Sequence, residues 1–302
     1  MKVVLIHNPA AGVEAQPSAD DVVQLIRAAG HSVLYRSANH ADWKKLLQEN
    51  ADLIAVAGGD GIVGKVAKLS LGRNIPIAVL PMGTANNIAG ALGLTDKSLE
   101  ELIAAWRRAR TTRFDVGVAR GPWGENYFLE GIGVGLFADT MSRLDARKNI
   151  DLAHLDAAEE KITSVLEIMH IRLESCPLHP LKLTLDDRDL SGEYILVEAM
   201  NIRSVGPNLV LAPHAEPGDG LLDVVLIAKN DEAELSEYLS KRIGKGTGSH
   251  GLTGRRARRL RLECTDSRIH IDDDLWPPKG APAPAVVEIF LADQSLEMLT
   301  PG

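Results

Sequence analysis

The stretch LIAVAGGDG, residues 53–61, decides the fold of this chain. Its apolar half predicts a buried strand, and the glycines that follow predict that the strand ends and a helix begins. In open parallel sheets, ligands bind beyond the carboxyl ends of the strands. Glycines at such a point let the backbone approach a phosphate, and the N–H groups at the start of a helix point toward it. The stretch therefore predicts a phosphate-binding loop on a parallel α/β sheet.

Asp60 within this loop narrows the choice of ligand. A carboxylate cannot help to bind bare phosphate, because like charges repel each other. It needs a cation between itself and the phosphate, or a hydroxyl group to orient. MgATP meets the first condition, since its metal bridges phosphate and carboxylate oxygens. A plain Gly-Asp-Gly turn without a ligand remains the alternative for this loop taken alone.

The residues around the loop follow an α/β pattern as far as about residue 110. Predicted strands lie at residues 3–6, 32–34, 53–57 and 77–80, and predicted helices at 20–29, 42–48, 62–71 and 99–106. Gly30 and Gly72 follow two of these helices, as glycine commonly does at helix ends. Strands that alternate with helices predict a parallel sheet with right-handed crossovers.

The pattern changes near residue 115, where strands become dominant. Strands are predicted at residues 112–118, 127–129, 181–185, 194–200, 223–228, 258–262, 268–271 and 286–291, with helices at 152–169 and 232–243. We therefore expect a nucleotide-binding α/β domain of residues 1–115 and a β-rich domain of residues 116–302.

Composition and charge exclude several classes of protein. The net charge of −8 argues against nucleic-acid binding. No apolar run reaches the roughly 18 residues that a membrane-spanning helix needs. Cys176 and Cys264 show no metal-binding spacing, which favours free thiols in a reducing compartment. Five arginines within residues 255–261 form either a solvated strand face or a docking patch for anionic lipid headgroups.

Two further loops carry glycine directly after a predicted strand. Residues 80–89, LPMGTANNIA, precede a helix; Gly83 permits close backbone approach and Thr84 can hydrogen-bond a phosphate. Asn86 or Asn87 could cap that helix, and a catalytic role for either residue is equally open. Residues 8–12, NPAAG, form the third loop. We expect the three loops to face one cleft, because the carboxyl ends of parallel strands share one edge of the sheet.

This ordered set of motifs resembles the diacylglycerol kinase catalytic-domain family, which includes bacterial soluble lipid kinases, sphingosine kinases and ceramide kinases. The resemblance rests on NPAAG at 8–12, GGDG at 58–61 and PMGTAN at 81–86. It continues through DVG at 115–117, GIG at 131–133 and residues 212–223, and so spans nearly the whole chain. Each motif alone is unspecific, whereas their order is specific.

The resemblance implies a fold and an activity. The fold would be a phosphofructokinase- or NAD-kinase-like parallel sheet followed by a β-sandwich domain, with the last residues returning to the first domain. The activity would be transfer of the γ-phosphoryl group of MgATP to a hydroxyl group of diacylglycerol or a related lipid. Such an enzyme is expected in the cytoplasm, in peripheral contact with the inner membrane face where its lipid substrate lies. Members of this family often pair as homodimers.

The same resemblance assigns site residues. The nucleotide-binding positions are Asn8, Pro9, Gly12, Ser37, Gly58, Gly59, Asp60, Gly61, Ile62, Gly83, Thr84 and Asn86. The Mg²⁺ site of bacterial relatives maps to the backbone carbonyls of Glu216 and Leu221 and to Asp219, with Asp223 nearby. Such oxygen ligands suit this hard cation.

The catalytic positions implied by the resemblance are three aspartates. Asp60 would orient metal or water, and Asp272 or Asp274 would take the proton from the lipid hydroxyl. If residues 272–274 continue a strand, Asp272 and Asp274 face one side and Asp273 faces the other. An acidic loop before the two prolines that follow is the alternative.

The chain departs from the family pattern at several positions. Ile62 replaces a threonine, Gly64 and Lys65 replace asparagine and glutamate, Asn87 replaces an aspartate, and Asp273 replaces a glycine. Lys65 reverses a charge beside the predicted phosphate loop, so it either neutralises phosphate directly or marks an impaired enzyme. A catalytically impaired protein that binds nucleotide or lipid, and an NAD-kinase-like enzyme, therefore remain alternatives.

Overall fold

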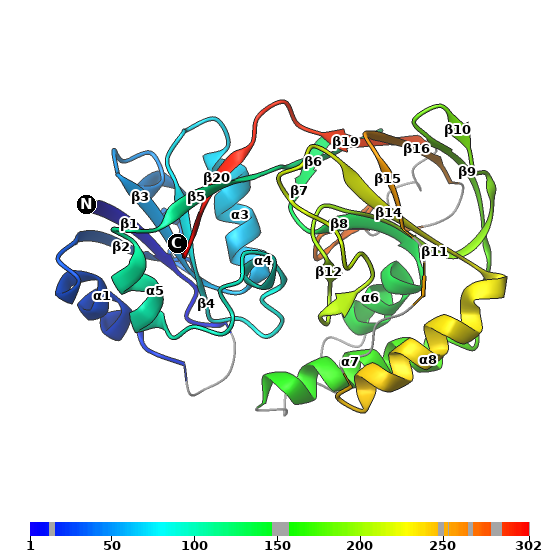
Figure 1. Ribbon diagram of the computed structural model, residues 1–302, viewed down its shortest axis with the longest axis horizontal. Helices are drawn as coiled ribbons and strands as arrows, with labels where there is room; N and C mark the ends of the chain where they lie inside the picture. Colours follow the sequence, from blue (N-terminus) through cyan, green and yellow to red (C-terminus); the bar gives the residue numbers. More distant parts are fainter. Residues whose placement is uncertain are drawn as a thin grey trace. The chain divides into compact units, whose positions relative to one another are not determined.

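The computed structural model of the chain describes residues 1–11, 16–146, 157–246, 251–252, 254–264, 268–278 and 286–301. The chain divides into two units, shown in Figure 1. The first unit comprises Met1–Val116 and Asp293–Gly302, and the second comprises Gly117–Ala292. The carboxyl-terminal segment thus belongs to the amino-terminal unit, where its red strand lies among the blue and cyan ones in Figure 1.

A six-stranded sheet forms the centre of the first unit. Its strands, in spatial order, are β2 (Ser32–Ser37), β1 (Lys2–His7), β3 (Leu53–Gly58), β4 (Ile77–Pro81), β20 (Leu296–Thr300) and β5 (Arg110–Phe114). The first four pair in parallel, and β20 is parallel to β4 and antiparallel to β5. The predicted parallel sheet is confirmed, and the strand from the far end of the chain, β20, lies within it between β4 and β5.

Helices lie along the chain between the strands of this sheet. They are α1 (Ala19–Ala28), α2 (Trp43–Leu46), α3 (Asp60–Ser70), α4 (Asn87–Ala91) and α5 (Leu99–Ala105). Ser18 and Ser98 begin α1 and α5 with capping boxes, in which serine and an acidic residue three positions later satisfy each other's backbone N–H groups. Helix α2 is shorter than predicted, and α3 starts earlier, because Gly59 is its N-cap.

The second unit is mainly a β-sandwich. Its strands are β6 (Gly117–Gly121), β7 (Gly124–Phe128), β8 (Gly131–Gly135), β9 (His179–Leu185), β10 (Arg188–Asp189), β11 (Gly192–Met200), β12 (Ser204–Val205), β13 (Leu209–Val210), β14 (Leu222–Ala228), β15 (Gly254–Ala257), β16 (Arg259–Glu263), β17 (Ile269–Ile271), β18 (Asp274–Trp276) and β19 (Val286–Leu291). The main path of pairing runs β18-β17-β8-β11-β9-β16-β19-β6-β7. Strand β9 pairs with both β11 and β16, so it connects the two layers.

Two apolar cores stabilise this unit. One lies inside the sandwich and includes Val197, Leu262 and Val287. The other lies where the helices pack on β11 and β14, and includes Leu196 and Leu235. The helices are α6 (Leu136–Ala146), α7 (Ala158–Leu173) and α8 (Glu232–Ile243), the last preceded by the short η1 (Lys229–Asp231). Neighbouring residues of β11 thus face opposite cores, as the alternation along a strand requires.

The predictions for this half differ from the described structure at several places. Residues 112–118 do not form one strand, because the chain leaves the first sheet after Phe114 and begins β6 at Gly117. Strand β8 was not predicted, since glycine is a poor strand former and three of its five residues are glycine. The first part of the helix predicted at 152–169 lies outside the described residues. None of the described helices is long and apolar enough to cross a membrane.

Candidate functional site

Three loops of the first unit line one cavity of about 430 Å³. Its wall is formed by Asn8, Ala10, Ala11, Ala38, Asn39, Trp43, Gly59, Gly61, Ile62, Lys65, Gly83 and Thr84. Strands β1, β3 and β4 are parallel neighbours, so the loops that follow them emerge at the same edge of the sheet. The predicted convergence of the three loops is therefore observed for their described residues.

Gly59 and Gly83 bring two of these loops into direct backbone contact. A Cβ atom on Gly59 would lie 2.9 Å from the Gly83 Cα, and one on Gly83 would lie 2.3 Å from the Gly59 Cα. Such distances leave no room for a side chain, because the neighbours are backbone atoms. Close by, the Met82 N–H donates to the Gly58 carbonyl at 3.0 Å. The two glycines are therefore required by the loop contact, whatever the cavity binds.

The carboxylate of Asp60 joins the same two loops. Its Oδ2 accepts a hydrogen bond from the Asn87 N–H and its Oδ1 accepts one from the Ile88 N–H, each at 2.9 Å. These N–H groups belong to the first turn of α4, where a helix has no partners of its own for them. A side-chain cap from Asn86 is not found, since that residue has a φ of 54° and makes no capping bond. Asp60 caps α4, and its catalytic role stays a prediction.

Asn86 instead closes its own loop. Its Oδ1 accepts a hydrogen bond from the Gly83 N–H at 2.8 Å, and its Nδ2 donates to the Gly83 carbonyl at 2.9 Å. Asparagine tolerates the left-handed backbone found here better than most residues do. The side-chain amide thus holds Gly83 in place against Gly59, and Asn86 shapes the cavity without being part of its wall.

Lys65 and Trp43 give the cavity chemical character. Lys65 lies on the second turn of α3 and is exposed, so its ammonium group adds positive charge to a wall rich in backbone groups. Positive charge in a concave site attracts anions. Trp43 contributes an aromatic side chain that is 8% exposed. Neither Trp43 nor Asn39 was predicted; the available signal was a lone tryptophan in a polar segment of an aromatic-poor chain.

Other predicted nucleotide positions lie beside the cavity or outside the description. Ser37 ends β2, and its Oγ accepts a 3.2 Å hydrogen bond from the N–H of Asn39, which is part of the wall. Gly58 is buried at the end of β3, and Pro9 is exposed. Gly12 lies outside the described residues. Nucleotide contact stays a prediction at these four positions, as it does at those that line the cavity.

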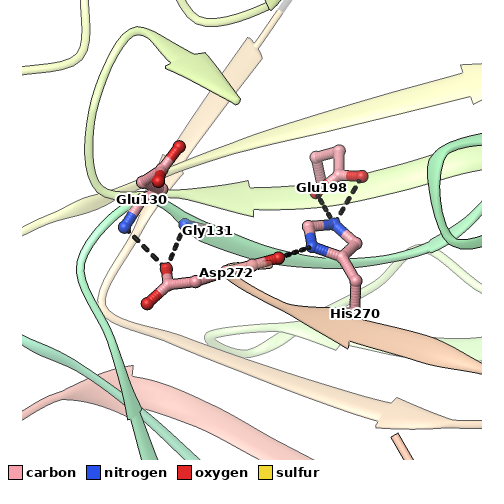
Figure 2. Close-up of polar contacts among 5 residues, drawn as sticks. All are labelled: Glu130, Gly131, Glu198, His270 and Asp272. Carbon is pink, nitrogen blue, oxygen red and sulfur yellow. Dashed lines mark hydrogen bonds and ion pairs between the residues drawn. The ribbon is translucent and has the colours of Figure 1, made fainter. Parts of the chain in front are cut away.

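Asp272 belongs to the second unit, in the turn that joins β17 to β18 (Figure 2). Its backbone is left-handed, with a φ of 48°. Its Oδ1 accepts hydrogen bonds from the N–H groups of Leu129, Glu130 and Gly131 at 3.1, 2.8 and 3.4 Å. Its Oδ2 accepts a 3.2 Å bond from the Leu129 N–H. Backbone donors before β8 thus hold the Asp272 carboxylate in one orientation.

The prediction that Asp272 and Asp274 face one side of a strand is wrong. Strand β17 ends at Ile271, and Asp272 and Asp273 form the turn, so alternation along a strand does not apply to them. Asp274 opens β18, pairs with Ile271 across the turn and is exposed. Of the two residues predicted as general base, Asp272 has the carboxylate that is fixed by several backbone donors.

The predicted Mg²⁺ ligands lie in and after the loop that leads into β14. The Asp219 Oδ1 accepts a 3.0 Å hydrogen bond from the Leu221 N–H, and its Oδ2 forms an ion pair with Arg256. The Glu216 carbonyl accepts bonds from two backbone N–H groups of the same loop, at 2.8 and 3.3 Å. A guanidinium group therefore occupies the place at Asp219 where a cation would bind.

Asp223 does not improve this donor set. Burial raises the pKa of the Asp223 carboxyl; His214 lowers the pKa and Glu216 raises it further. A carboxyl that holds its proton more tightly is a weaker metal ligand. The residues present therefore do not fit a bare Mg²⁺ well, and the metal site stays a prediction.

Another group of side chains within the described residues could hold a metal ion. It consists of Asp139, Cys176 and His179. Cys176 and Cys264 are both free cysteines, as the sequence predicts. Burial, together with the Asp139 charge, raises the pKa of the Cys176 thiol to about 11. The Arg172 Nη2 already lies 3.7 Å from the Asp139 Oδ2 and forms an ion pair with it. A protonated thiol and a competing guanidinium both disfavour a cation there.

Comparisons with known proteins agree with this two-part description. The family model for the diacylglycerol kinase catalytic domain matches residues 2–119, and the model for the YegS C-terminal NAD kinase beta sandwich-like domain matches residues 146–290. A diacylglycerol kinase of Mycobacterium tuberculosis is 25% identical over 99% of this chain and 95% of its own length. A Pseudomonas aeruginosa protein named "Probable lipid kinase YegS-like" is 28% identical over 83% of this chain and 80% of its own.

Solved structures share the fold. A diacylglycerol kinase from Bacillus anthracis has a TM-score of 0.72 at 23% identity, covering 98% of this chain and 96% of that one. Yeast NADH kinase in complex with NADH has a TM-score of 0.52 at 8% identity, covering 100% and 84%. At such identities the structures inform the fold alone. The two matched domains follow each other in the order of the two units, and the chain belongs to the diacylglycerol kinase catalytic-domain family.

Proposed function

We propose that this protein is a lipid kinase that transfers the γ-phosphoryl group of MgATP to a hydroxyl group of diacylglycerol or a related lipid. The observation that carries the proposal is the cavity at which the loops after β1, β3 and β4 meet. Relatives named as diacylglycerol kinase or lipid kinase align with most or nearly all of the chain, which supports the same class of reaction here.

The cavity offers groups suited to the phosphates of ATP. Gly61 and Ile62 place the first turn of α3 on its wall, and the amino-terminal end of a helix favours negative charge. Lys65 adds a full positive charge, Gly83 exposes backbone, and Thr84 offers a hydroxyl group. Mg²⁺ that arrives with the nucleotide would neutralise further phosphate charge. The part of the chain is to hold the phosphates in line for transfer.

Asp272 is the general base in this proposal. Its carboxylate would accept the proton of the lipid hydroxyl while the hydroxyl oxygen bonds to the γ-phosphorus and the bond to ADP breaks. General-base catalysis contributes roughly 10²- to 10⁴-fold to a rate, and it requires a carboxylate held in a defined direction. The hydrogen bonds from Leu129, Glu130 and Gly131 supply that constraint.

We also propose that the protein works on the cytoplasmic side of a membrane, in peripheral contact with its lipid. Arg255, Arg258 and Arg259 are exposed on or between β15 and β16 and support this location. Each exposed arginine near an anionic lipid surface is worth about 1 kcal/mol of attraction. Arg256 and Arg261 are paired with acidic side chains, which reduces the charge of the patch.

A labelled-lipid screen tests the proposed activity. Purified protein is incubated with γ-labelled MgATP and a lipid extract that contains diacylglycerol, phosphatidylglycerol and sphingoid bases. Labelled lipid should appear in the organic phase, and Asp272→Asn should reduce it by about 10²-fold or more. The lipid that carries the label identifies the acceptor. Absence of label under conditions in which a diacylglycerol kinase relative is active would contradict the proposal.

Two alternatives are separated by the same preparation. Residues 146–290 match an NAD kinase beta sandwich-like domain, and yeast NADH kinase shares the fold. Both similarities favour phosphorylation of NAD as the second candidate function. Formation of NADP from NAD and ATP would establish it. The departures at Ile62, Lys65, Asn87 and Asp273 favour an impaired enzyme. Calorimetric binding of ATP without turnover of lipid or NAD would support that alternative.

A further inference from the structure

A pair of buried ionisable side chains lies beside Asp272 and takes no part in the site described so far. His270 on β17 and Glu198 on β11 are both 0% exposed. The His270 Nε2 lies 2.9 and 2.8 Å from the two carboxylate oxygens of Glu198. The His270 Nδ1 lies 3.0 Å from the carbonyl oxygen of Asp272. Figure 2 shows the resulting chain of contacts from Glu198 through His270 to Asp272.

The register of the sheet builds this contact across a glycine. Gly133 on β8 pairs with Glu198 of β11 on one side and with His270 of β17 on the other. A Cβ atom on Gly133 would lie 2.3 Å from the Glu198 carboxyl group. The missing side chain therefore lets Glu198 and His270 meet above β8. Phe137 of α6 packs edge-on against the imidazole with ring centroids 4.6 Å apart, which completes the enclosure.

The acceptors around the imidazole determine where its protons are. A backbone carbonyl can only accept a hydrogen bond, so Nδ1 carries a proton and donates a hydrogen bond to the Asp272 carbonyl. The Glu198 carboxylate accepts a second bond from Nε2. Burial by itself lowers the pKa of His270, but the charge and hydrogen bond of Glu198, with those of Asp272, outweigh burial and raise that pKa above its usual value. His270 is therefore placed to donate to the Asp272 carbonyl, and the raised pKa favours its protonated form beside Glu198.

Stability alone gives little reason to keep such a pair. Replacing a buried ion pair by apolar residues of similar volume is often neutral, or stabilising by roughly 1–4 kcal/mol. The second nitrogen of His270, however, holds a residue with an unusual backbone, because Asp272 is left-handed without being glycine. The Asp272 N–H also donates to the Gly131 carbonyl at 2.9 Å. Both backbone polar groups of Asp272 are thus held on either side of its left-handed bend.

We propose that Glu198 and His270 are positioning residues for Asp272. The Nδ1–H group of His270 holds the Asp272 carbonyl, this contact fixes the left-handed turn, and the turn sets the direction of the Asp272 carboxylate. The inference rests on the proposed function, in which that carboxylate is the general base, because a displacement of about 1 Å in a reacting group can cost 10²-fold in rate.

A double variant separates positioning from simple stabilisation. Glu198→Leu with His270→Leu removes both charges together and keeps the interior filled. We expect thermal stability close to wild type, a KM for MgATP within about twofold, and a kcat reduced about 10- to 100-fold. A double variant with the wild-type kcat would overturn the proposal, because the pair would then matter for packing alone.

A conservative variant and a matched control sharpen the test. In Glu198→Gln the amide donates to Nε2 of a neutral imidazole, whose Nδ1–H still reaches Asp272, so kcat should stay within about threefold of wild type. His170→Leu removes another histidine of this unit, one that bonds to Ser236 between α7 and α8, and should leave kcat unchanged. Equal losses of kcat in Glu198→Gln and in the double variant would contradict positioning through Nδ1.

Hydrogen exchange gives a readout that needs no activity. The amide protons of Leu129 and Glu130 are bonded to the Asp272 carboxylate, so they should exchange faster in the double variant and stay protected in Glu198→Gln. Unchanged protection in the double variant overturns positioning. If the wild-type protein phosphorylates no lipid and these amide protons still exchange faster in the double variant, positioning is supported and the proposed function is refuted. If the double variant does not fold, Gly133→Ala, which displaces the Glu198 carboxyl, takes its place in both measurements.

Discussion

At the scale of single residues, Lys65 is a departure from the family pattern that lies on the wall of the proposed phosphate site. A variant at this position tests whether the lysine impairs phosphate binding or contributes to it. The side chain lies on the cavity wall, where its ammonium group can meet phosphate oxygens. Lys65→Ala should raise the KM for MgATP about tenfold or more, because a charged hydrogen bond is worth roughly 1.5–3 kcal/mol. Steady-state kinetics measure this change, with Lys182→Ala, an exposed lysine of the other unit, as control. An unchanged KM in Lys65→Ala would remove this residue from the phosphate site.

The contact between Gly59 and Gly83 gives a second prediction for single residues. Gly83→Ala should lower the free energy of unfolding by about 1–3 kcal/mol and weaken nucleotide binding, because the new Cβ meets the Gly59 backbone at 2.3 Å. Urea unfolding and calorimetry measure the two effects. Gly90→Ala is the matched control: its Cβ would find only Thr95 at 4.0 Å, and alanine favours a helix such as α4. Equal stability in the two variants would mean that the loops separate readily.

At the scale of elements, the start of α4 depends on a carboxylate from a different loop. In Asp60→Asn one acceptor oxygen becomes an N–H₂ group that faces the donors Asn87 and Ile88. The free energy of unfolding should fall by about 1–2 kcal/mol, as for the loss of a helix cap. Chemical unfolding followed by circular dichroism measures the change, with the exposed Asp96→Asn as control. Loss of activity at unchanged stability would instead assign Asp60 a direct catalytic role.

Strand β8 shows at the same scale why glycine can be required where it is a poor strand former. Gly133 leaves space for Glu198, and Gly135 lies so close to the Ile195 carbonyl that a Cβ would be 2.1 Å from it. Each glycine is required because an atom of β11 occupies the space where its side chain would lie. Strand β11 comes about 60 residues later in the chain. Local propensity therefore argues against this strand, while the packed sheet requires it.

At the scale of the whole molecule, the buried pair makes stability depend on pH. The pKa of His270 is raised in the folded protein above the usual 6.5. The stabilisation it brings is therefore fully present below about pH 6.5 and is lost as pH rises through the higher folded value. The groups that face the imidazole are Glu198 from β11 and Asp272, while β8 contributes glycine and α6 contributes Phe137.

The free energy of unfolding of wild type should thus decline from pH 6.5 to 8.5 relative to that of the Glu198→Leu, His270→Leu variant. Burial raises the pKa of the Cys176 and Cys264 thiols to about 11, and both proteins carry these thiols, so their titration cancels from the difference. Denaturant titrations at several pH values measure the difference. Parallel pH profiles for the two proteins would mean that His270 does not change its charge with folding.

Much of the first unit could be predicted because its signals are local. Apolar runs mark β1, β3 and β4, glycine loops follow each of them, and parallel neighbours must place those loops at one edge. These local signals are enough to predict that the three glycine loops meet at one cavity. The cap of α4 could not be predicted in this way. It comes from Asp60 and not from an adjacent asparagine, because the side-chain amide of Asn86 is bonded to Gly83.

The amino-acid sequence by itself determined the α/β character of the first unit, the β-rich character of the second and the motifs of the three glycine loops. The family resemblance implies that the last residues return to the first unit. Tertiary structure alone decided that β20 lies between β4 and β5, that Asp272 lies in a turn, and that His270 meets Glu198 across Gly133. The physical reason is the distance along the chain over which each kind of signal acts. Strand period, helix period and turn chemistry act between residues a few positions apart, whereas strand register brings together side chains that are distant along the chain, and no local pattern encodes their partners.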